Sequence, residues 1–202
     1  MYYAVGNRCA IDFKELGLPI SEQEAIEILQ TKGFKKIDVD ITSLAMGFIG
    51  VSTYRRSARL SEAPGVFDCS SFVKWLYGQR GIWLPRRSIQ QRECGMPITD
   101  ASKLVGGDIV FVSGHVNYFL SDPLDGVGHV GIVSDAGTVV HAANSRLGIV
   151  ESTMENFTQK GLRGIRRIIP SDRVVHTFIT PDEREVESSD DIRWIVLQTL
   201  TV

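Results

Sequence analysis

Three residues of this 202-residue chain have the types and the spacing that nucleophilic catalysis needs. Cys69 follows Asp68 in the stretch GVFDCSSFVKWLYG and opens an amphipathic run that is typical of a helix. A cysteine at the start of a helix lies near unpaired backbone N–H groups, and these groups and the helix dipole lower the pKa of a thiol. The same N–H groups can hold the oxyanion that forms when a thiolate attacks a carbonyl carbon.

Two later runs, GVGHVGIVSD and TVVHAANS, supply a base for this cysteine. They place His129 at the start of one predicted strand and His141 near the end of the next, and the segment DAGT between them is a good hairpin connection. We expect His129 to take the proton of Cys69 and His141 to orient His129 through its second ring nitrogen. The even separation of the two histidines does not fix the face on which they lie, because the turn intervenes.

Taken alone, each of these residue types more often has a structural role than a catalytic one. A lone cysteine at a helix start is usually incidental, and a lone histidine usually makes structural hydrogen bonds. The joint pattern favours catalysis because it can supply a nucleophile, a base and an orienting group together. Cys69, His129 and His141 could instead be three ligands of a catalytic zinc ion, which is a distant alternative. We otherwise expect no metal and no cofactor.

The spacing of apolar residues changes along the chain, and with it the type of element that is predicted. The first half is typical of helices, and Ser21 and Glu24 form a capping box at the start of SEQEAIEILQTKG. The second half has short β-branched runs separated by turn residues, which predict successive antiparallel strands. Helices followed by a meander indicate an α+β domain. The predicted strands are DIVFVSG, GHVGIVSD, TVVHAAN, LGIVEST and GIRRIIP.

The chain resembles the NlpC-type cysteine peptidases, which are papain-like enzymes that act on bacterial cell-wall peptides. The resemblance extends from about Leu44 to Phe157 and rests on five motifs in order: FDCSSFVKWLYG, LPRRSIQQ, GGDIVF, GHVGIV and VVHAAN. It implies a papain-like α+β fold, with N-terminal helices and a nucleophile helix packed on an antiparallel sheet. By position it implies that Cys69 is the nucleophile, His129 the base and His141 the orienting residue.

The resemblance also implies roles for residues around the cysteine. Tyr54 would reach the site with its hydroxyl, with a core aromatic as the alternative. Asp68 and Ser70 would hold the free amine of a peptide substrate, and Asp68 could equally be only the cap of the helix that begins at Cys69. Arg86 would brace the sheet, and Asp108 would fix a turn. The chain departs from the family where YRRSARLSEAPG replaces a Trp-Gly-Gly run and where the loop at 113–128 is long. Arg55, Arg56 and Arg59 of the first of these loops could meet a carboxylate, although a solvated loop is the more common outcome.

The implied function is a thiol hydrolase that cleaves an amide bond of a peptide through a thioester intermediate. The expected substrate is a cell-wall fragment, with a D-Glu–diamino acid linkage as an example. The same three residues would also serve an acyltransferase or an amidase on a substrate outside the cell wall. A peptide-binding module without catalysis is the third alternative.

The organisation of the chain follows from the extent of the resemblance. We expect a helical extension over residues 1–43 that packs on the core, a catalytic domain over 44–170 and a C-terminal extension over 171–202. A net charge of −2 gives no reason to expect a nucleic-acid partner. No run approaches the ~18 apolar residues of a membrane span.

The sequence gives only indirect information on the compartment and on the oligomeric state. Residues 1–15 lack the pattern of a signal peptide, so the sequence as it stands predicts a cytoplasmic protein. It would be secreted or periplasmic if exported by another route or trimmed. No motif indicates an oligomeric state.

Overall fold

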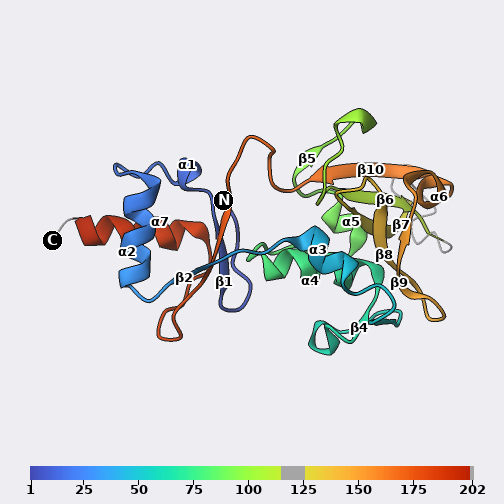
Figure 1. Ribbon diagram of the computed structural model, residues 1–202, viewed down its shortest axis with the longest axis horizontal. Helices are drawn as coiled ribbons and strands as arrows, with labels where there is room; N and C mark the ends of the chain where they lie inside the picture. The colour runs from blue at the N-terminus through green and yellow to red at the C-terminus, as the bar shows by residue number, and fades with distance from the viewer. Residues whose placement is uncertain (115–125, 201–202) are drawn as a thin grey trace. The chain divides into compact units, whose positions relative to one another are not determined.

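The computed structural model describes residues 1–114 and 126–200, which form two compact units with a sheet and helices in each (Figure 1). The second unit holds residues 40–76 and 84–168, and the first holds the two ends of the chain and residues 77–83. Each unit is assembled from more than one stretch of the chain, whereas the expected domains are single stretches. The expected boundaries at 43 and 170 therefore stay a prediction. Residues 1–43 contain two strands besides their helices.

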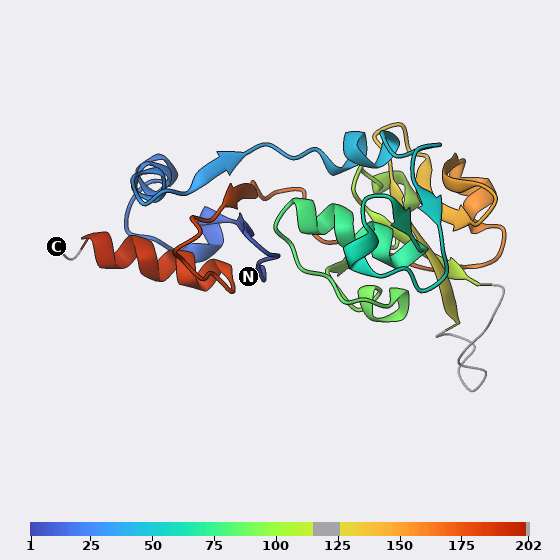
Figure 2. The same cartoon turned by 90° about the horizontal axis from the view of Figure 1, so that it is seen from below.

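The first unit joins the two ends of the chain in a three-stranded antiparallel sheet. Its central strand β11 (His176–Ile179) pairs with β1 (Arg8–Ile11) on one side and β2 (Lys35–Ile37) on the other. Figures 1 and 2 accordingly show blue N-terminal and red C-terminal segments side by side in this unit. Its helices are α1 (Phe13–Leu16), α2 (Glu22–Thr31) and α7 (Ser189–Leu200).

The core of the first unit lies where these helices meet the sheet. Leu29 of α2, Phe178 of β11 and Val196 of α7 are fully buried and belong to one apolar cluster. The predicted capping box starts α2: Ser21 accepts from the backbone N–H of Glu24, and the Glu24 carboxylate accepts from the backbone N–H of Ser21 at 2.9 Å.

The second unit is built on a six-stranded antiparallel sheet with the strand order β5-β10-β6-β7-β8-β9. Four consecutive strands of this sheet form the predicted meander, and β10 brings the chain back beside β6. The strands are β5 (Met96–Pro97), β6 (Ile109–Ser113), β7 (Val127–Val133), β8 (Val139–Asn144), β9 (Gly148–Ser152) and β10 (Leu162–Arg167).

Short elements surround this sheet and carry part of the site. β3 (Thr53–Tyr54) and β4 (Val66–Phe67) form a separate parallel pair. Phe48, Phe67, Phe72 and Trp75 pack against one another around the helix that begins at Cys69, in edge-to-face and tilted pairs. The helical elements are α3 (Ile41–Met46), η1 (Leu60–Glu62), α4 (Cys69–Gln79), α5 (Ser88–Gln91), η2 (Ala101–Lys103) and α6 (Met154–Thr158).

The predicted α+β class is confirmed, and so are the capped helix at 21–33 and the strands of the meander. The strands β1, β2 and β11 were missed by the sequence patterns. They are three or four residues long and pair across most of the chain, so no local alternation or turn marks them.

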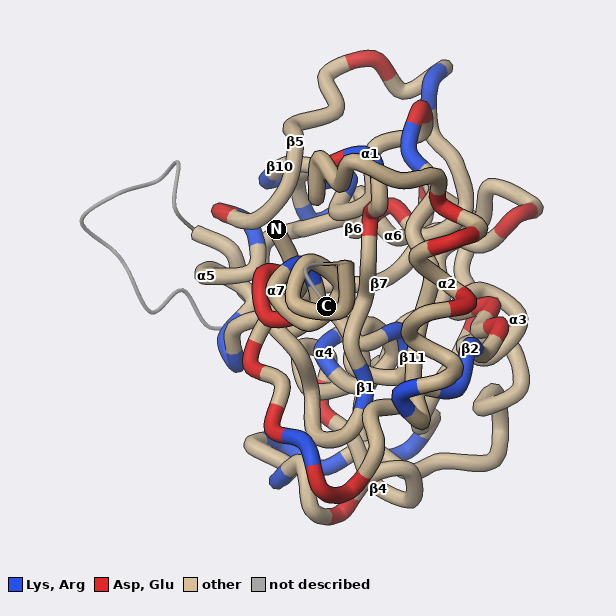
Figure 3. Tube along the Cα trace, turned by 90° about the vertical axis from the view of Figure 1, so that its left-hand side faces the viewer, with Lys and Arg blue, Asp and Glu red and all other residues tan. Residues whose placement is uncertain are grey.

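The structure shows how charged residues are distributed and whether any helix is long and apolar. Basic and acidic residues are interspersed along the trace, with no long block of either sign (Figure 3). Over residues 1–114 and 126–200, no helix combines the length and the apolar character needed to cross a bilayer.

A buried ion pair ties β10 to the start of β6. The guanidinium of Arg167 donates from Nε and Nη2 to the two carboxylate oxygens of Asp108 at 2.8 and 2.7 Å. The side chains are 9% and 1% exposed, so water screens the pair very little. Asp108 also accepts from the backbone N–H of Val105 at 3.0 Å, which confirms the turn that the sequence analysis assigned to it.

We expect Arg167→Met to lower the free energy of unfolding by about 3–5 kcal/mol, because it leaves the Asp108 carboxylate buried without its cation. Urea unfolding measures this loss. Arg163→Met in the same strand is the matched control, with a loss below about 1 kcal/mol. Adding Asp108→Asn to Arg167→Met should recover part of the loss. Equal losses in the Arg167 and Arg163 variants would contradict this role.

Candidate active site

The start of α4 is fixed by the residues around Cys69. Asp68 accepts from the backbone N–H of Ser71 at 2.8 Å, and the Ser71 hydroxyl accepts from the backbone N–H of Asp68 at 2.8 Å. This reciprocal cap satisfies two N–H groups and sets the first turn at Cys69. Ser71 stands where the family pattern has glycine, and here its hydroxyl is part of the cap.

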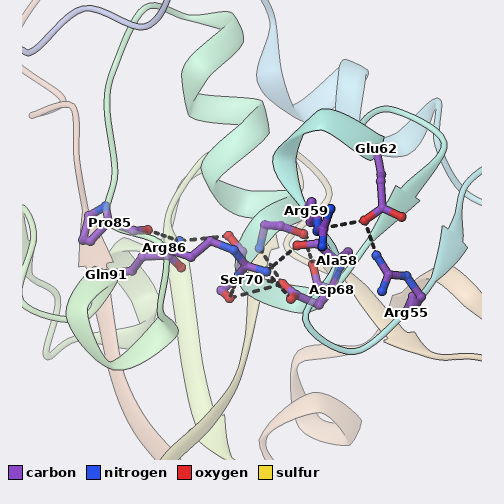
Figure 4. Close-up of polar contacts among 10 residues, drawn as sticks. Arg55, Ala58, Arg59, Glu62, Asp68, Ser70, Pro85, Arg86 and Gln91 are labelled. Carbon is purple, nitrogen blue, oxygen red and sulfur yellow. Dashed lines mark hydrogen bonds and ion pairs between the residues drawn. The ribbon is translucent and has the colours of Figure 1, made fainter.

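The LPRRSIQQ motif braces this helix start from outside (Figure 4). Arg86 donates to the Asp68 carboxylate at 3.0 Å, to the Ser70 hydroxyl at 2.9 Å and to the carbonyl of Ala58 at 2.6 Å. The fully buried Gln91 donates to the carbonyl of Ser70 at 2.9 Å. The expectation that Arg86 braces the sheet is wrong. Its contacts join the helix start to the loop before β4.

The register of β7 and β8 decides the face of the two histidines. Ile132 pairs with Val140 and Val133 with Val139, so Gly131 and His141 come opposite each other, and His129 shares their face. A Cβ atom on Gly131 would lie 3.1 Å from the His141 Cβ and 3.2 Å from the Phe157 ring. The glycine therefore makes the room in which the two imidazoles meet.

The two imidazoles form a hydrogen-bonded line that continues to a serine. His129 Nε2 lies 2.9 Å from His141 Nδ1, and His141 Nε2 lies 3.0 Å from the Ser152 hydroxyl. Phe157 of α6 packs against both rings, with centroid distances of 5.5 and 4.8 Å. Burial, assisted by the positive charge of Lys160, lowers the pKa of His141 to about 4. His141 is therefore neutral at neutral pH and can accept a hydrogen bond from His129.

Cys69 is partly buried and lines the same cleft as the two histidines. Its sulfur takes hydrogen bonds from the backbone N–H groups of Val130, the residue after His129, and of Ser70. These bonds favour the thiolate, but burial and the charge of Asp68 outweigh them and raise the thiol pKa to about 12. The expected lowering of this pKa is wrong for the free protein, because desolvation of the thiolate raises the pKa by more than the N–H groups of the helix start lower it.

The cleft has a volume of about 420 Å³ and lies within the second unit. Tyr54 lines it, since the β3–β4 pair sets Tyr54 beside Phe67, two residues before Cys69. Burial raises the pKa of the Tyr54 phenol, and the nearby Cys69 and Asp68 contribute to this rise. Ser70 and Asp68 are buried and do not line the cleft, so their role in holding a substrate amine stays a prediction.

Two loops depart from the family pattern, and the structure describes all of the first but only the ends of the second. In the first, Arg55 forms an ion pair with Glu62, whose carboxylate also accepts from the backbone N–H of Arg59 at 2.7 Å (Figure 4). Arg56 of the same loop lines the cleft. Residues 115–125 of the second loop lie outside the described residues.

The zinc alternative receives no support from this geometry. The facing nitrogens of His129 and His141 point at each other at hydrogen-bond distance. Within the described part of the chain, no group of three or more His, Cys, Asp and Glu side chains is arranged to hold a metal ion.

Ser152 and Lys160 were missed by the sequence analysis. Ser152 pairs with Val139, which places it on the face of His141. Lys160 follows α6, which covers that face. Only the strand register and the packing of α6 mark these residues, and the local sequence carries neither signal.

Comparison with known proteins gives matches in the region that forms this site. The model of the NlpC/P60 family matches residues 52–167, which is more than half of the chain. A probable endopeptidase of Corynebacterium glutamicum is 40% identical over 96 residues, which are 47% of this chain and 40% of that protein. The peptidoglycan DL-endopeptidase CwlO of Bacillus licheniformis is 30% identical over 132 residues, 63% of this chain and 27% of that protein.

A solved structure agrees with these matches. NlpC2 from Trichomonas vaginalis superposes with a TM-score of 0.53 at 25% identity, covering 63% of this chain and 45% of that one. This chain thus spans less than half the length of the relatives and the structure named here.

The lowered pKa of His141 makes stability depend on pH. Between about pH 6.5 and 4 the unfolded chain binds a proton at this residue that the folded chain does not. We therefore expect the free energy of unfolding to fall by about 3 kcal/mol as the pH drops through this range. In His141→Gln, which does not titrate there, the fall should be smaller by about this amount. Urea unfolding at several pH values checks this, and identical pH slopes for the two proteins would contradict it.

Proposed function

The chain belongs to the NlpC/P60 family, and from this premise we propose that its second unit is a cysteine peptidase that cleaves an amide bond in a cell-wall peptide. The bond we favour joins D-Glu to a diamino acid. The observation that carries the proposal is the line of groups in one cleft: Cys69, followed by His129, His141 and Ser152. The names of the relatives, an endopeptidase and a peptidoglycan DL-endopeptidase, support the class of bond and of substrate.

The pKa values of Cys69 and His141 suggest how the proton moves. With a pKa of about 12, the Cys69 sulfur carries its proton in the free protein, so attack on a carbonyl requires a base. His129 uses Nε2 toward His141, and Nδ1 is its other ring nitrogen. If His141 holds its single proton on Nε2 toward Ser152, its Nδ1 accepts from His129 Nε2–H. His129 Nδ1 is then the nitrogen that takes the thiol proton.

The reaction then has two halves. In the first, the Cys69 proton passes to His129 as the sulfur bonds to the carbonyl carbon, and the C–N bond breaks as His129 returns the proton to the leaving amine. This leaves a thioester on Cys69. In the second, a water molecule gives a proton to His129 and its oxygen displaces the sulfur, which takes the proton back. Backbone N–H groups at the start of α4 can hold the oxyanion of each half.

Cys69→Ala is expected to abolish turnover of a defined muropeptide, by at least about a thousandfold, while the unfolding midpoint stays close to that of the wild type. Mass analysis of the products measures the loss and identifies the bond that is cleaved. Cys94→Ala is the matched control, because that thiol lies in the same unit but outside the cleft. Full activity of the Cys69 variant would refute the proposal.

Ser152 is a positioning residue for His141 in this scheme. Ser152→Ala leaves Nε2 of a buried imidazole without its partner, so the ring is no longer held in one tautomer. We expect kcat to fall about tenfold with KM unchanged, and Ser152→Thr to restore kcat because it keeps the hydroxyl. Steady-state kinetics on the same muropeptide separates the two constants. A Thr variant as slow as the Ala variant would argue against this role.

A further inference from the structure

Two glycines meet in the cleft at the point where the regular pairing of β6 and β7 ends. Gly114 directly follows β6, and Gly128 is the second residue of β7. Both line the cleft together with His129. The mechanism proposed above gives neither glycine a role.

The pairing of β6 with β7 is irregular beside the base. Val112 pairs with His129. The next pair is Ser113 with Val127, so one step along β6 corresponds to two steps along β7. Gly128 is therefore the extra residue of a β-bulge, and it directly precedes His129. Because a bulge bends its strand and changes the direction of nearby side chains, the direction of the His129 ring depends on this bulge.

The two backbones approach so closely that neither position has room for a side chain. A Cβ atom on Gly128 would lie 2.3 Å from the Cα atom and 2.4 Å from the backbone nitrogen of Gly114. A Cβ atom on Gly114 would lie 2.7 Å from the Cα atom of Gly128. The obstructing atoms are backbone atoms, which cannot turn aside as the end of a side chain can. Any side chain at either position must therefore push the two strands apart.

Backbone torsion does not account for these glycines. Neither of them has a positive φ, in contrast to Gly137 in the turn between β7 and β8, where φ is 77°. Negative and extended φ values are open to all residue types. The requirement for glycine at positions 114 and 128 thus comes from the space between the strands.

The part of β7 next to the bulge is tied to both neighbours of the base. The N–H of Val130 is hydrogen-bonded to the Cys69 sulfur. Nε2 of His129 lies 2.9 Å from Nδ1 of His141. A change in the spacing of the strands at Gly128 therefore acts on the base and on its contacts with the nucleophile and the orienting residue.

We propose that Gly114 and Gly128 are positioning residues for His129. Their contact holds the bulge closed and sets the place of the imidazole relative to the Cys69 sulfur. The proposal rests on the function proposed above, and it assigns the glycines no contact with the reacting atoms. A misplacement of about 1 Å between reacting groups can slow a reaction about a hundredfold, so a small opening of the bulge is sufficient to affect catalysis.

Gly128→Ala tests this role by steady-state kinetics of the full chain on the defined muropeptide. We expect kcat to fall about a hundredfold and KM to change less than about threefold, because the cleft is retained while the base is displaced. Gly114→Ala should lower kcat less, by about tenfold, because its Cβ atom would lie farther from the opposite backbone. This second variant keeps the test decisive if Gly128→Ala does not fold, which urea unfolding shows.

Gly47→Ala is the matched control. Gly47 ends α3 in the same unit with a helical φ of −63°, and a Cβ atom there would lie 3.4 Å from the carbonyl oxygen of Leu44. This distance is an ordinary contact, so no backbone has to move. The variant should keep kcat within about twofold of the wild type.

Side-chain NMR of the histidines separates the failure of this inference from the failure of the proposed function. Spectra of the ¹⁵N-labelled full chain report the tautomer and the hydrogen bonds of each ring and need no turnover. In either glycine variant the signals of His129 and His141 should shift, whereas the signal of His176 in the first unit should not.

Each outcome of the two measurements decides the matter. If the wild type cleaves no muropeptide but the His129 and His141 signals shift in the variants, the positioning role stands and the proposed reaction fails. Unchanged signals of these two rings in a folded variant, or shifted signals with an unchanged kcat, would overturn the positioning role.

Discussion

The antiparallel register of β7 and β8 is the constraint on which the site depends. A shift of one residue between these strands would move His141 to the opposite face from His129, and the 2.9 Å contact between their nitrogens would be lost. The register of β8 and β9 places Ser152 on the face of His141, and Gly131 of β7 leaves the space that the two rings use. Phe157 then covers both rings and removes water from them.

Burial shifts the pKa values of Cys69 and His141 in opposite directions. Desolvation disfavours the charged form of each group, so it keeps the Cys69 thiol protonated and keeps His141 neutral. In the proposed mechanism, a neutral His141 is the partner that His129 needs when it receives a proton, and Cys69 is protonated before substrate binds. In the proposed mechanism, the thiolate therefore forms as substrate is attacked.

The motif around Arg86 supports the start of α4, whereas the sequence analysis expected it to brace the sheet. Its guanidinium and the amide of Gln91 hold the first turn of α4 and the loop before β4. The resemblance links Asp68 to substrate binding. In the structure its carboxylate accepts hydrogen bonds from the backbone N–H of Ser71 in the helix cap and from Arg86. Arg56 and Lys160, which line the cleft, lie outside the five motifs.

The sequence by itself determined the α+β class, the capping of α2 and α4, the meander of β6 to β9, and the identity of Cys69, His129 and His141 as candidates, because caps, alternation and turn residues act over a few neighbouring positions. The tertiary structure alone decided that the two histidines share a face, that Ser152 and Lys160 join them, and that the thiol pKa rises. It also formed the sheet of β1, β2 and β11 from segments far apart in the chain. These outcomes depend on strand register and on exclusion of water, which are properties of the whole packed unit and leave no local pattern in the residues.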